Sequence, residues 1–290
     1  MPTGYPSKRS DRFSLLLSRV RQSPLKFPVL WLVLALALFF ASNWANLLPS
    51  PAIAQMPRSP DFSLPVPRQH PLPSTLAAWS DRSGDYFDQI QPVSVGYLIW
   101  SKFPVSVYIE PATTTEIATP FTRQRAETWI RAVTQAVQEW QAYLPLQVEA
   151  AAEAADIKVL RSPPPLKLAP APSATGADRP DRPGLVLGRA RSAETRFELY
   201  LHPGSDNSSY LSHRVTIQLR PDQAETYLKA AARHELGHAL GIWGHSPLQT
   251  DALYFSQVRN PPTISPRDVN TLKRVYEQPT RLGWPVSARE

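Results

Sequence analysis

Residues 234–245 are HELGHALGIWGH, and the spacing of their polar side chains decides how the chain is interpreted. On an α-helix, His234 and His238 lie one turn apart on the same face, where both imidazoles can bind one Zn²⁺ ion. Glu235 can then accept a proton from a zinc-activated water. Gly241 suits a helix end with a positive φ, after which His245 can return as a third ligand.

The H-E-x-x-H pattern alone is a moderate signal, because it arises by chance in roughly one chain of this length in a hundred. A plain amphipathic helix would also explain His, Glu and Leu at these positions. The following glycine and third histidine favour a metal site over that alternative.

The extended motif resembles that of the metzincin zinc peptidases, H-E-x-x-H-x-x-G-x-x-H, and is most similar to the matrixin branch. The resemblance implies an α+β fold: a metzincin-like zinc peptidase domain with a twisted, mostly parallel sheet, two long helices and a C-terminal helix. It also implies an exported zinc-dependent endopeptidase that hydrolyses peptide bonds, with Glu235 as general base and His234, His238 and His245 as metal ligands.

The third ligand departs from the family pattern. Gly244 stands at the family's third histidine position, and His245 follows one residue later. A turn beside a glycine can absorb one extra residue. Asp251 is the competing ligand, since some metzincins use an aspartate, although it is better placed to accept backbone hydrogen bonds. A gluzincin-like site with Asp268 as ligand is a further alternative, and a zinc-stabilised binding module without turnover is another.

The residues after His245 are also similar to matrixins. Asp251-Ala252-Leu253-Tyr254-Phe255 occupies the place of the family's Met-containing turn, with Leu253 where the methionine would be. A Leu-for-Met exchange conserves volume, so we expect an apolar floor beneath the metal. Ser265 is expected to cap a final helix over residues 266–276.

The N-terminal region predicts export. Residues 1–26 contain six Lys/Arg against one Asp, and an apolar run over residues 27–41 precedes an A-x-A site ending at Ala54. This pattern is typical of a signal peptide over residues 1–54, with a secreted or periplasmic product. Fifteen apolar residues fall short of the ~20 of a spanning helix, but an uncleaved N-terminal membrane anchor remains an alternative.

Composition limits the other functions. Formal charge is +7, of which +5 lies in residues 1–54, so the basic character gives no reason to expect nucleic-acid binding. The absence of cysteine excludes disulfides and thiolate ligands. We expect a monomer that takes a protein or peptide substrate and contacts a membrane only through an uncleaved leader.

Residues 55–78 are Pro-rich and predict an extended linker, so the catalytic domain is expected over residues 79–290. Periodicity predicts strands at 94–100, 104–110, 146–149 and 155–160, and a helix over 123–143 capped by Thr122. A Pro-rich insertion spans 162–184. Strand-like pieces at 184–191, 195–201 and 214–219 precede the histidine-containing helix. His202 and His213 flank a polar turn with Asp206, where a second, structural metal is an open alternative.

Overall fold

The computed structural model describes residues 62–165, 168–169, 186–187, 191–205 and 208–288. The predicted leader, residues 1–54, lies outside this part of the chain, as does most of the predicted insertion at 162–184. Within that predicted insertion, β5 (Leu168–Ala169) pairs antiparallel with β6 (Val186–Leu187), which follows it. In the described ranges, no helix is both long and apolar enough to span a membrane.

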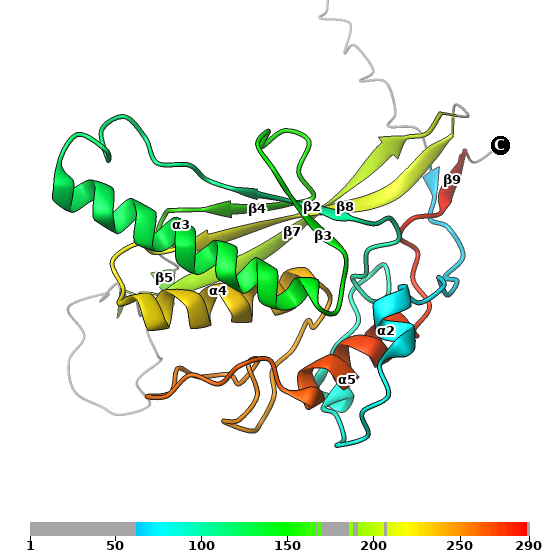
Figure 1. The fold of residues 1–290 in the computed structure, drawn as a ribbon. Helices are drawn as coiled ribbons and strands as arrows, with labels where there is room; N and C mark the ends of the chain where they lie inside the picture. Colours follow the sequence, from blue (N-terminus) through cyan, green and yellow to red (C-terminus); the bar gives the residue numbers. More distant parts are fainter. Residues whose placement is uncertain (1–61, 166–167, 170–185, 188–190, 206–207, 289–290) are drawn as a thin grey trace, which may run out of the picture. The chain divides into compact units, whose positions relative to one another are not determined.

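A seven-stranded mixed sheet forms the upper layer in Figure 1. Its strands lie in the order β1 (Phe62–Ser63), β9 (Pro285–Ala288), β8 (Ser209–Leu219), β4 (Ile157–Leu160), β2 (Val105–Ile109) and β3 (Leu146–Glu149), with β7 (Ala193–Pro203) paired to β8. The pairs β2–β3, β2–β4 and β4–β8 are parallel, whereas β7–β8 is antiparallel. The predicted α+β class with a largely parallel sheet is therefore confirmed.

Alternating apolar residues hold this sheet against the helices. Every second residue of the central strands is buried, as the period-2 pattern predicts: Val105, Val107, Ile157, Val159, Val215 and Ile217. The predicted strands at 104–110, 146–149, 155–160, 195–201 and 214–219 correspond to β2, β3, β4, β7 and β8.

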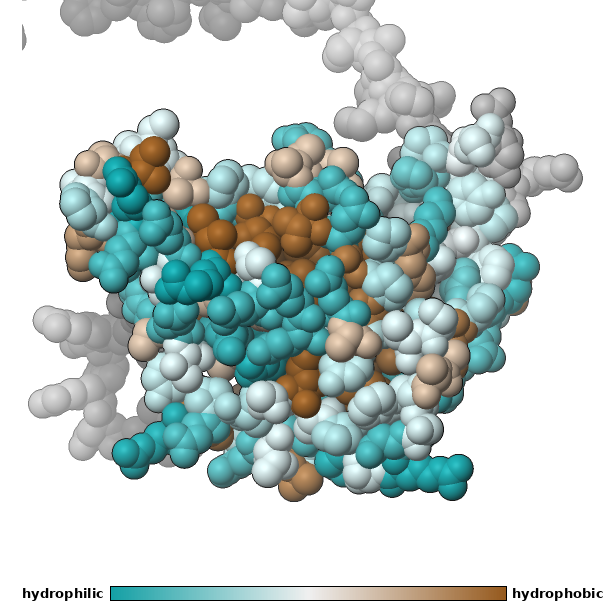
Figure 2. Space-filling view, in the orientation of Figure 1, coloured by the Kyte–Doolittle hydropathy of each residue, from teal (hydrophilic) through white to brown (hydrophobic). Residues whose placement is uncertain are grey.

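Helix α3 (Pro120–Gln141) covers one face of the sheet. Its buried residues recur at helical spacing and include Ala126, Trp129, Val133, Val137 and Trp140. Figure 2 shows the outward side of α3 as largely hydrophilic, with apolar side chains gathered between the helix and the strands. The predicted cap, Thr122, is wrong: Thr119 caps the helix and accepts a hydrogen bond from the Thr122 amide at 3.2 Å. Pro120 can follow directly because the first helical amide needs no partner.

Helix α4 (Glu225–Ala239), which contains His234 and His238, lies beside α3 on the same side of the sheet (Figure 1). The Arg233 side chain is only 4% exposed and donates to both carboxylate oxygens of Glu139 on α3, at 2.5 and 2.9 Å. Trp140 Nε1 donates to the Arg233 carbonyl at 2.9 Å. A buried guanidinium is tolerated only with such partners, so these bonds fix α4 against α3.

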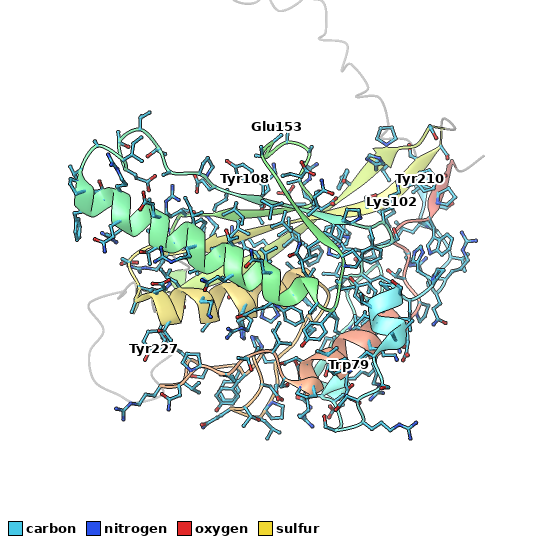
Figure 3. The ribbon with its side chains drawn as sticks, viewed as in Figure 1. Trp79, Lys102, Tyr108, Glu153, Tyr210 and Tyr227 are labelled. Atoms are coloured by element: carbon cyan, nitrogen blue, oxygen red, sulfur yellow. The ribbon has the colours of Figure 1, made fainter. Side chains whose placement is uncertain are left out.

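Helix α5 (Pro266–Tyr276) begins at the predicted position, with Ser265 and Asp268 forming a capping box. The short helix α2 (Ser74–Ala78) packs near it. Trp79 Nε1, labelled in Figure 3, donates to Asn270 Oδ1 on α5 at 2.8 Å.

The prediction of an extended linker over residues 55–78 is wrong from residue 62 onward. Leu76 is fully buried, Arg68 exchanges backbone hydrogen bonds with Thr280, and His70 stacks on Trp284 at 4.2 Å. The packed part of the described chain accordingly includes residues 62–78 and does not begin at residue 79. Proline has no amide hydrogen to donate within a β-sheet, but a Pro-rich segment can still pack against a distant part of the chain.

The strand predicted at residues 94–100 is also wrong. Gly96 has φ +91° and closes a turn through hydrogen bonds with Val93 in both directions. The apolar residues that suggested a strand are buried without a ladder: Val95, Leu98, Ile99 and Trp100. Their burial satisfies the hydrophobic pattern, which by itself does not distinguish a strand from a buried irregular segment.

Candidate metal centre

The end of α4 is built to turn the chain back toward the two histidines. Gly241 has φ +129°, as its sequence position predicts, and its amide donates to His238 O while the Ile242 amide donates to Gly237 O. This is a Schellman motif. Trp100 Nε1 and Tyr276 OH donate to the carbonyls of Ala239 and Leu240, at 2.9 and 3.0 Å. The last carbonyls of the helix are thus satisfied by two aromatic side chains.

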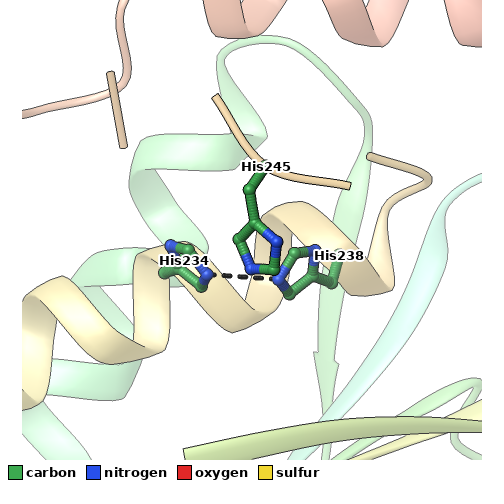
Figure 4. A group of neighbouring side chains, drawn as sticks. All are labelled: His234, His238 and His245. Carbon is green, nitrogen blue, oxygen red and sulfur yellow. Dashed lines mark hydrogen bonds between the residues drawn. The ribbon is translucent and has the colours of Figure 1, made fainter. Parts of the chain in front are cut away.

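The chain then brings His245 over His234 and His238, as Figure 4 shows. One ligand atom from each of the three side chains lies within 4.8 Å of the others. The His245 ring lies 5.3 Å from that of His234 and 4.9 Å from that of His238. His245 is exposed and the other two are partly buried, so the group is open to solvent on one side.

The extra residue before His245 is absorbed by tertiary contacts. Trp243 packs edge-to-face on Phe197 of β7, with centroids 5.2 Å apart. Gly244 has no space for a side chain, because a Cβ there would collide with the carbonyl of Gln89. Gly244 therefore lies directly against the Gln89 backbone, and His245, the next residue, faces the other two histidines.

The hydrogen bonds of the two helical histidines leave their Nε2 atoms able to bind a metal ion. His234 Nδ1 lies 2.9 Å from the Ala252 carbonyl and His238 Nδ1 lies 2.7 Å from the Ile242 carbonyl. A carbonyl can only accept, so both Nδ1 atoms bear the proton and both Nε2 atoms present lone pairs. These Nε2 atoms are 3.1 Å apart, the dashed contact of Figure 4. Two lone pairs at that distance repel each other unless a proton or a metal ion lies between them, and a tetrahedral metal site would separate the ligand nitrogens by a similar distance, about 3.3 Å.

The surroundings also favour the neutral, metal-binding form of His238 and His245. Burial lowers the pKa of His238 well below its ordinary value, with a further contribution from the neighbouring His234. Partial desolvation, with a contribution from His234, likewise lowers the pKa of His245, although its side chain stays exposed on one side. Neutral rings at neutral pH offer their lone pairs without first losing a proton, so the residues present fit a divalent metal ion.

Glu235 lies between α4 and β7. Thr195 Oγ1 of β7 donates to its Oε2 at 2.5 Å and lies 3.2 Å from its backbone oxygen. Burial raises the pKa of Glu235, partly offset by the neighbouring His234 ring and by the hydrogen bond from Thr195. A carboxyl group with a raised pKa exchanges protons more readily near neutral pH, as general acid–base chemistry requires.

Leu253 is fully buried beneath the site, where the sequence predicts an apolar floor. A Cβ at Gly237, on α4 between the two histidines, would lie 2.6 Å from Leu253 Cδ2. Gly237 is thus required for close contact between the helix and the turn. His245 and the turn are joined by the Ser246 amide, which donates to Leu253 O at 2.8 Å.

The two aspartates considered as alternative ligands have other roles. Asp251 is 1% exposed and accepts from Ser246 Oγ, Ser265 Oγ and Arg267 Nε, at 2.5, 2.8 and 3.1 Å. Asp268 is fully buried and accepts from the Ala252 amide at 2.8 Å and from Tyr86 OH. Neither belongs to the histidine group, so both support the turn around Leu253 instead.

Comparison with known proteins adds no family. No model of a known protein family matches the chain, and no curated protein matches it significantly. The candidate site therefore stands on its own geometry.

The second metal site considered at His202 and His213 is not assembled in the described residues. In the β7–β8 ladder His202 pairs with Tyr210, and His213 pairs with Leu199, so the two histidines point to opposite faces. His213 is buried and stacked on Trp100 at 3.9 Å. Asp206 lies outside the described residues.

Sequence reasoning missed Thr195, Trp100 and Tyr276. Each contacts α4 from a segment at least 36 residues away in the chain, through one hydrogen bond to Glu235, Ala239 or Leu240. No local motif marks such partners. The available signal was the alternation within the strand predicted at 195–201, which puts Thr195 on the same face as Phe197.

Proposed function

We propose that this protein is an exported, matrixin-like zinc endopeptidase of the metzincin type. The observation that carries the proposal is the pair of Nε2 lone pairs held 3.1 Å apart, with His245 beside them and the Glu235 carboxylate on the same helix. Three imidazoles without thiolate or clustered carboxylate favour zinc among the common divalent ions.

The openness of the site favours catalysis over a purely structural role. Structural zinc sites are closed by four protein ligands, whereas catalytic sites keep one position for water or substrate. Here the group contains three histidines, and His245 is exposed. A metal-stabilised module without turnover would also have no need of a carboxylate next to the first ligand.

In the proposed mechanism of peptide hydrolysis, each of the following residues has a separate role. His234, His238 and His245 hold the metal, which when bound polarises the scissile carbonyl and acidifies water. Glu235 accepts the proton of the attacking water and returns it to the leaving amine. The carbonyls of Ala252 and Ile242 orient the two helical ligands through their Nδ1 protons.

Strand β7 offers the edge along which an extended peptide would bind. Among the described strands β7 pairs only with β8, so its other edge is available for backbone hydrogen bonds. Leu199 and Leu201 share the face of Thr195 by strand alternation and are 39% and 38% exposed. We therefore infer a preference for peptides with apolar side chains next to this strand.

Metal analysis and peptide digestion, performed side by side on wild type and Glu235→Gln, test the proposal. We expect one equivalent of zinc in both proteins, cleavage of a mixed peptide library by wild type, and a loss of nearly all turnover in the variant. Chelation should abolish wild-type cleavage, and added zinc should restore it. Zinc binding without any cleavage would instead identify a binding module, and an equal rate in Glu235→Gln would exclude this mechanism.

A further inference from the structure

The hydroxyl of Thr195 and the carboxylate of Glu235 meet across two different elements. Thr195 lies near the start of β7 and Glu235 in the last turns of α4, forty residues later. Thr195 Oγ1 approaches Glu235 Oε2 to 2.5 Å, the length of a strong hydrogen bond to an ionised oxygen. The same hydroxyl lies farther, 3.2 Å, from the Glu235 carbonyl, so the side-chain oxygen is the preferred acceptor.

The donor is held rigidly. Thr195 pairs with Ile217 of β8, and β8 pairs in turn with β4 in the centre of the sheet. A β-branched side chain has few allowed χ1 rotamers, so the position of Oγ1 follows from the backbone. A glutamate side chain has three rotatable bonds and loses rotamer entropy when it is held in one orientation, and the hydrogen bond from Thr195 offsets that loss.

The contact leaves one oxygen for chemistry. Within the described residues, no group donates a hydrogen bond to Glu235 Oε1. Oε2 is bound by the sheet, and Oε1 is left to accept a proton. This division of the two oxygens is what a general base next to a metal site requires.

We propose that Thr195 is a positioning residue, which holds the Glu235 carboxylate in the orientation that receives the proton of the attacking water. The inference rests on the proposed endopeptidase function and assigns to it a residue of β7 that the histidine motif does not contain. Thr195 acts through Glu235 and contacts neither the metal ligands nor the scissile bond.

Three substitutions separate this role from a structural one. Thr195→Val keeps the shape and removes the hydroxyl, whereas Thr195→Ser keeps the hydroxyl and removes the methyl group. Thr216→Val is the matched control, because Thr216 lies on the neighbouring strand β8, pairs with Arg196 and points to the opposite face of the sheet.

Steady-state kinetics, zinc content and melting temperature are measured for all four proteins. We expect kcat of Thr195→Val to fall about ten- to hundredfold, the cost of one hydrogen bond to a charged group, with KM within about twofold and zinc retained. Thr195→Ser should stay within about threefold of wild type, and Thr216→Val should be unchanged. Wild-type kcat in Thr195→Val would overturn the proposal, as would an equal loss in Thr195→Ser.

Crystal structures of the zinc-loaded wild type and Thr195→Val give a readout that does not depend on turnover. We expect the Glu235 side chain to occupy one rotamer in wild type and to leave it in the variant, with the three histidines unmoved. An identical, single Glu235 conformation in both crystals would overturn the proposal. If no protein cleaves any peptide, the endopeptidase function fails, and the crystals still decide whether Thr195 positions Glu235.

Discussion

Leu253 packs against Gly237 at the point on α4 that lies between His234 and His238. A Cβ on Gly237 would lie 2.6 and 3.0 Å from the two methyl carbons of Leu253, and 3.1 Å from Trp140 Cζ2. The helix, the turn and α3 therefore meet without room for one additional carbon atom. The position of the helix face that bears His234 and His238 depends on this contact, since a shift of α4 would move both histidines.

Substitution of Gly237 by Ala tests that contact. In an exposed helix this change stabilises by about 1 kcal/mol, but overpacking of a filled core costs roughly 1–3 kcal/mol. Because Leu253 is fully buried and cannot swing aside, we expect Gly237→Ala to lower the melting temperature and the zinc affinity. In a Leu253→Ala background, where space is available for the added methyl group, Gly237→Ala should instead raise the melting temperature. Thermal unfolding of the four proteins of this cycle is the measurement, and additive effects would contradict the contact.

Leu253 itself should tolerate Met and reject Asp. Leu253→Met conserves volume and should change stability by less than about 1.5 kcal/mol. Leu253→Asp places a charge in a fully buried position without a partner, so we expect a loss of several kcal/mol. Unfolding in urea compares the variants, and a Leu253→Asp protein with wild-type stability would show that this residue does not form the floor of the site.

A comparison of His245→Ala with Asp251→Ala tests which residue is the third ligand. His245 is exposed and contributes little to packing, so its removal should lower zinc affinity by orders of magnitude and leave the zinc-free melting temperature nearly unchanged. Asp251 binds two hydroxyls and Arg267, and its removal should lower the melting temperature. Zinc affinity should then fall only about 10–100-fold, as for an outer partner. Retained zinc in His245→Ala, with loss in Asp251→Ala, would reverse the assignment.

The buried His213 should make the free energy of unfolding depend on pH. Burial lowers its pKa from 6.5 to about 3, so the unfolded chain binds a proton more readily than the folded one. The contribution of the neutral His213 to the free energy of unfolding is therefore complete above pH 6.5. It is lost as pH falls from 6.5 toward 3, and the free energy of unfolding changes by up to ~1.4 kcal/mol per pH unit in this window. His213→Phe keeps an aromatic ring against Trp100 and has no proton to bind. We expect its unfolding free energy to depend less on pH in this window, and parallel curves for the two proteins would refute the prediction.

The sequence alone determined the elements whose causes are local. The α5 helix begins at Ser265 because the hydroxyl, the Pro266 ring and the Asp268 carboxylate lie within four residues. Strands β2, β4 and β8 follow from alternating apolar residues, and the HELGH spacing places two imidazoles on one helical face. The Gly241 turn likewise needs only its own conformational freedom.

Tertiary structure decided everything that depends on partners distant in the chain. Pro-rich residues 62–78 become part of the domain because Thr280, Leu282 and Trp284 supply their contacts. His245 faces the other histidines because Gly244 passes the Gln89 carbonyl and Trp243 packs on Phe197. Glu235 is oriented by a hydroxyl forty residues earlier. A sequence pattern reports which surfaces a segment must bury, but the partner that buries them is selected only when the loops between distant segments close and the core packs without gaps.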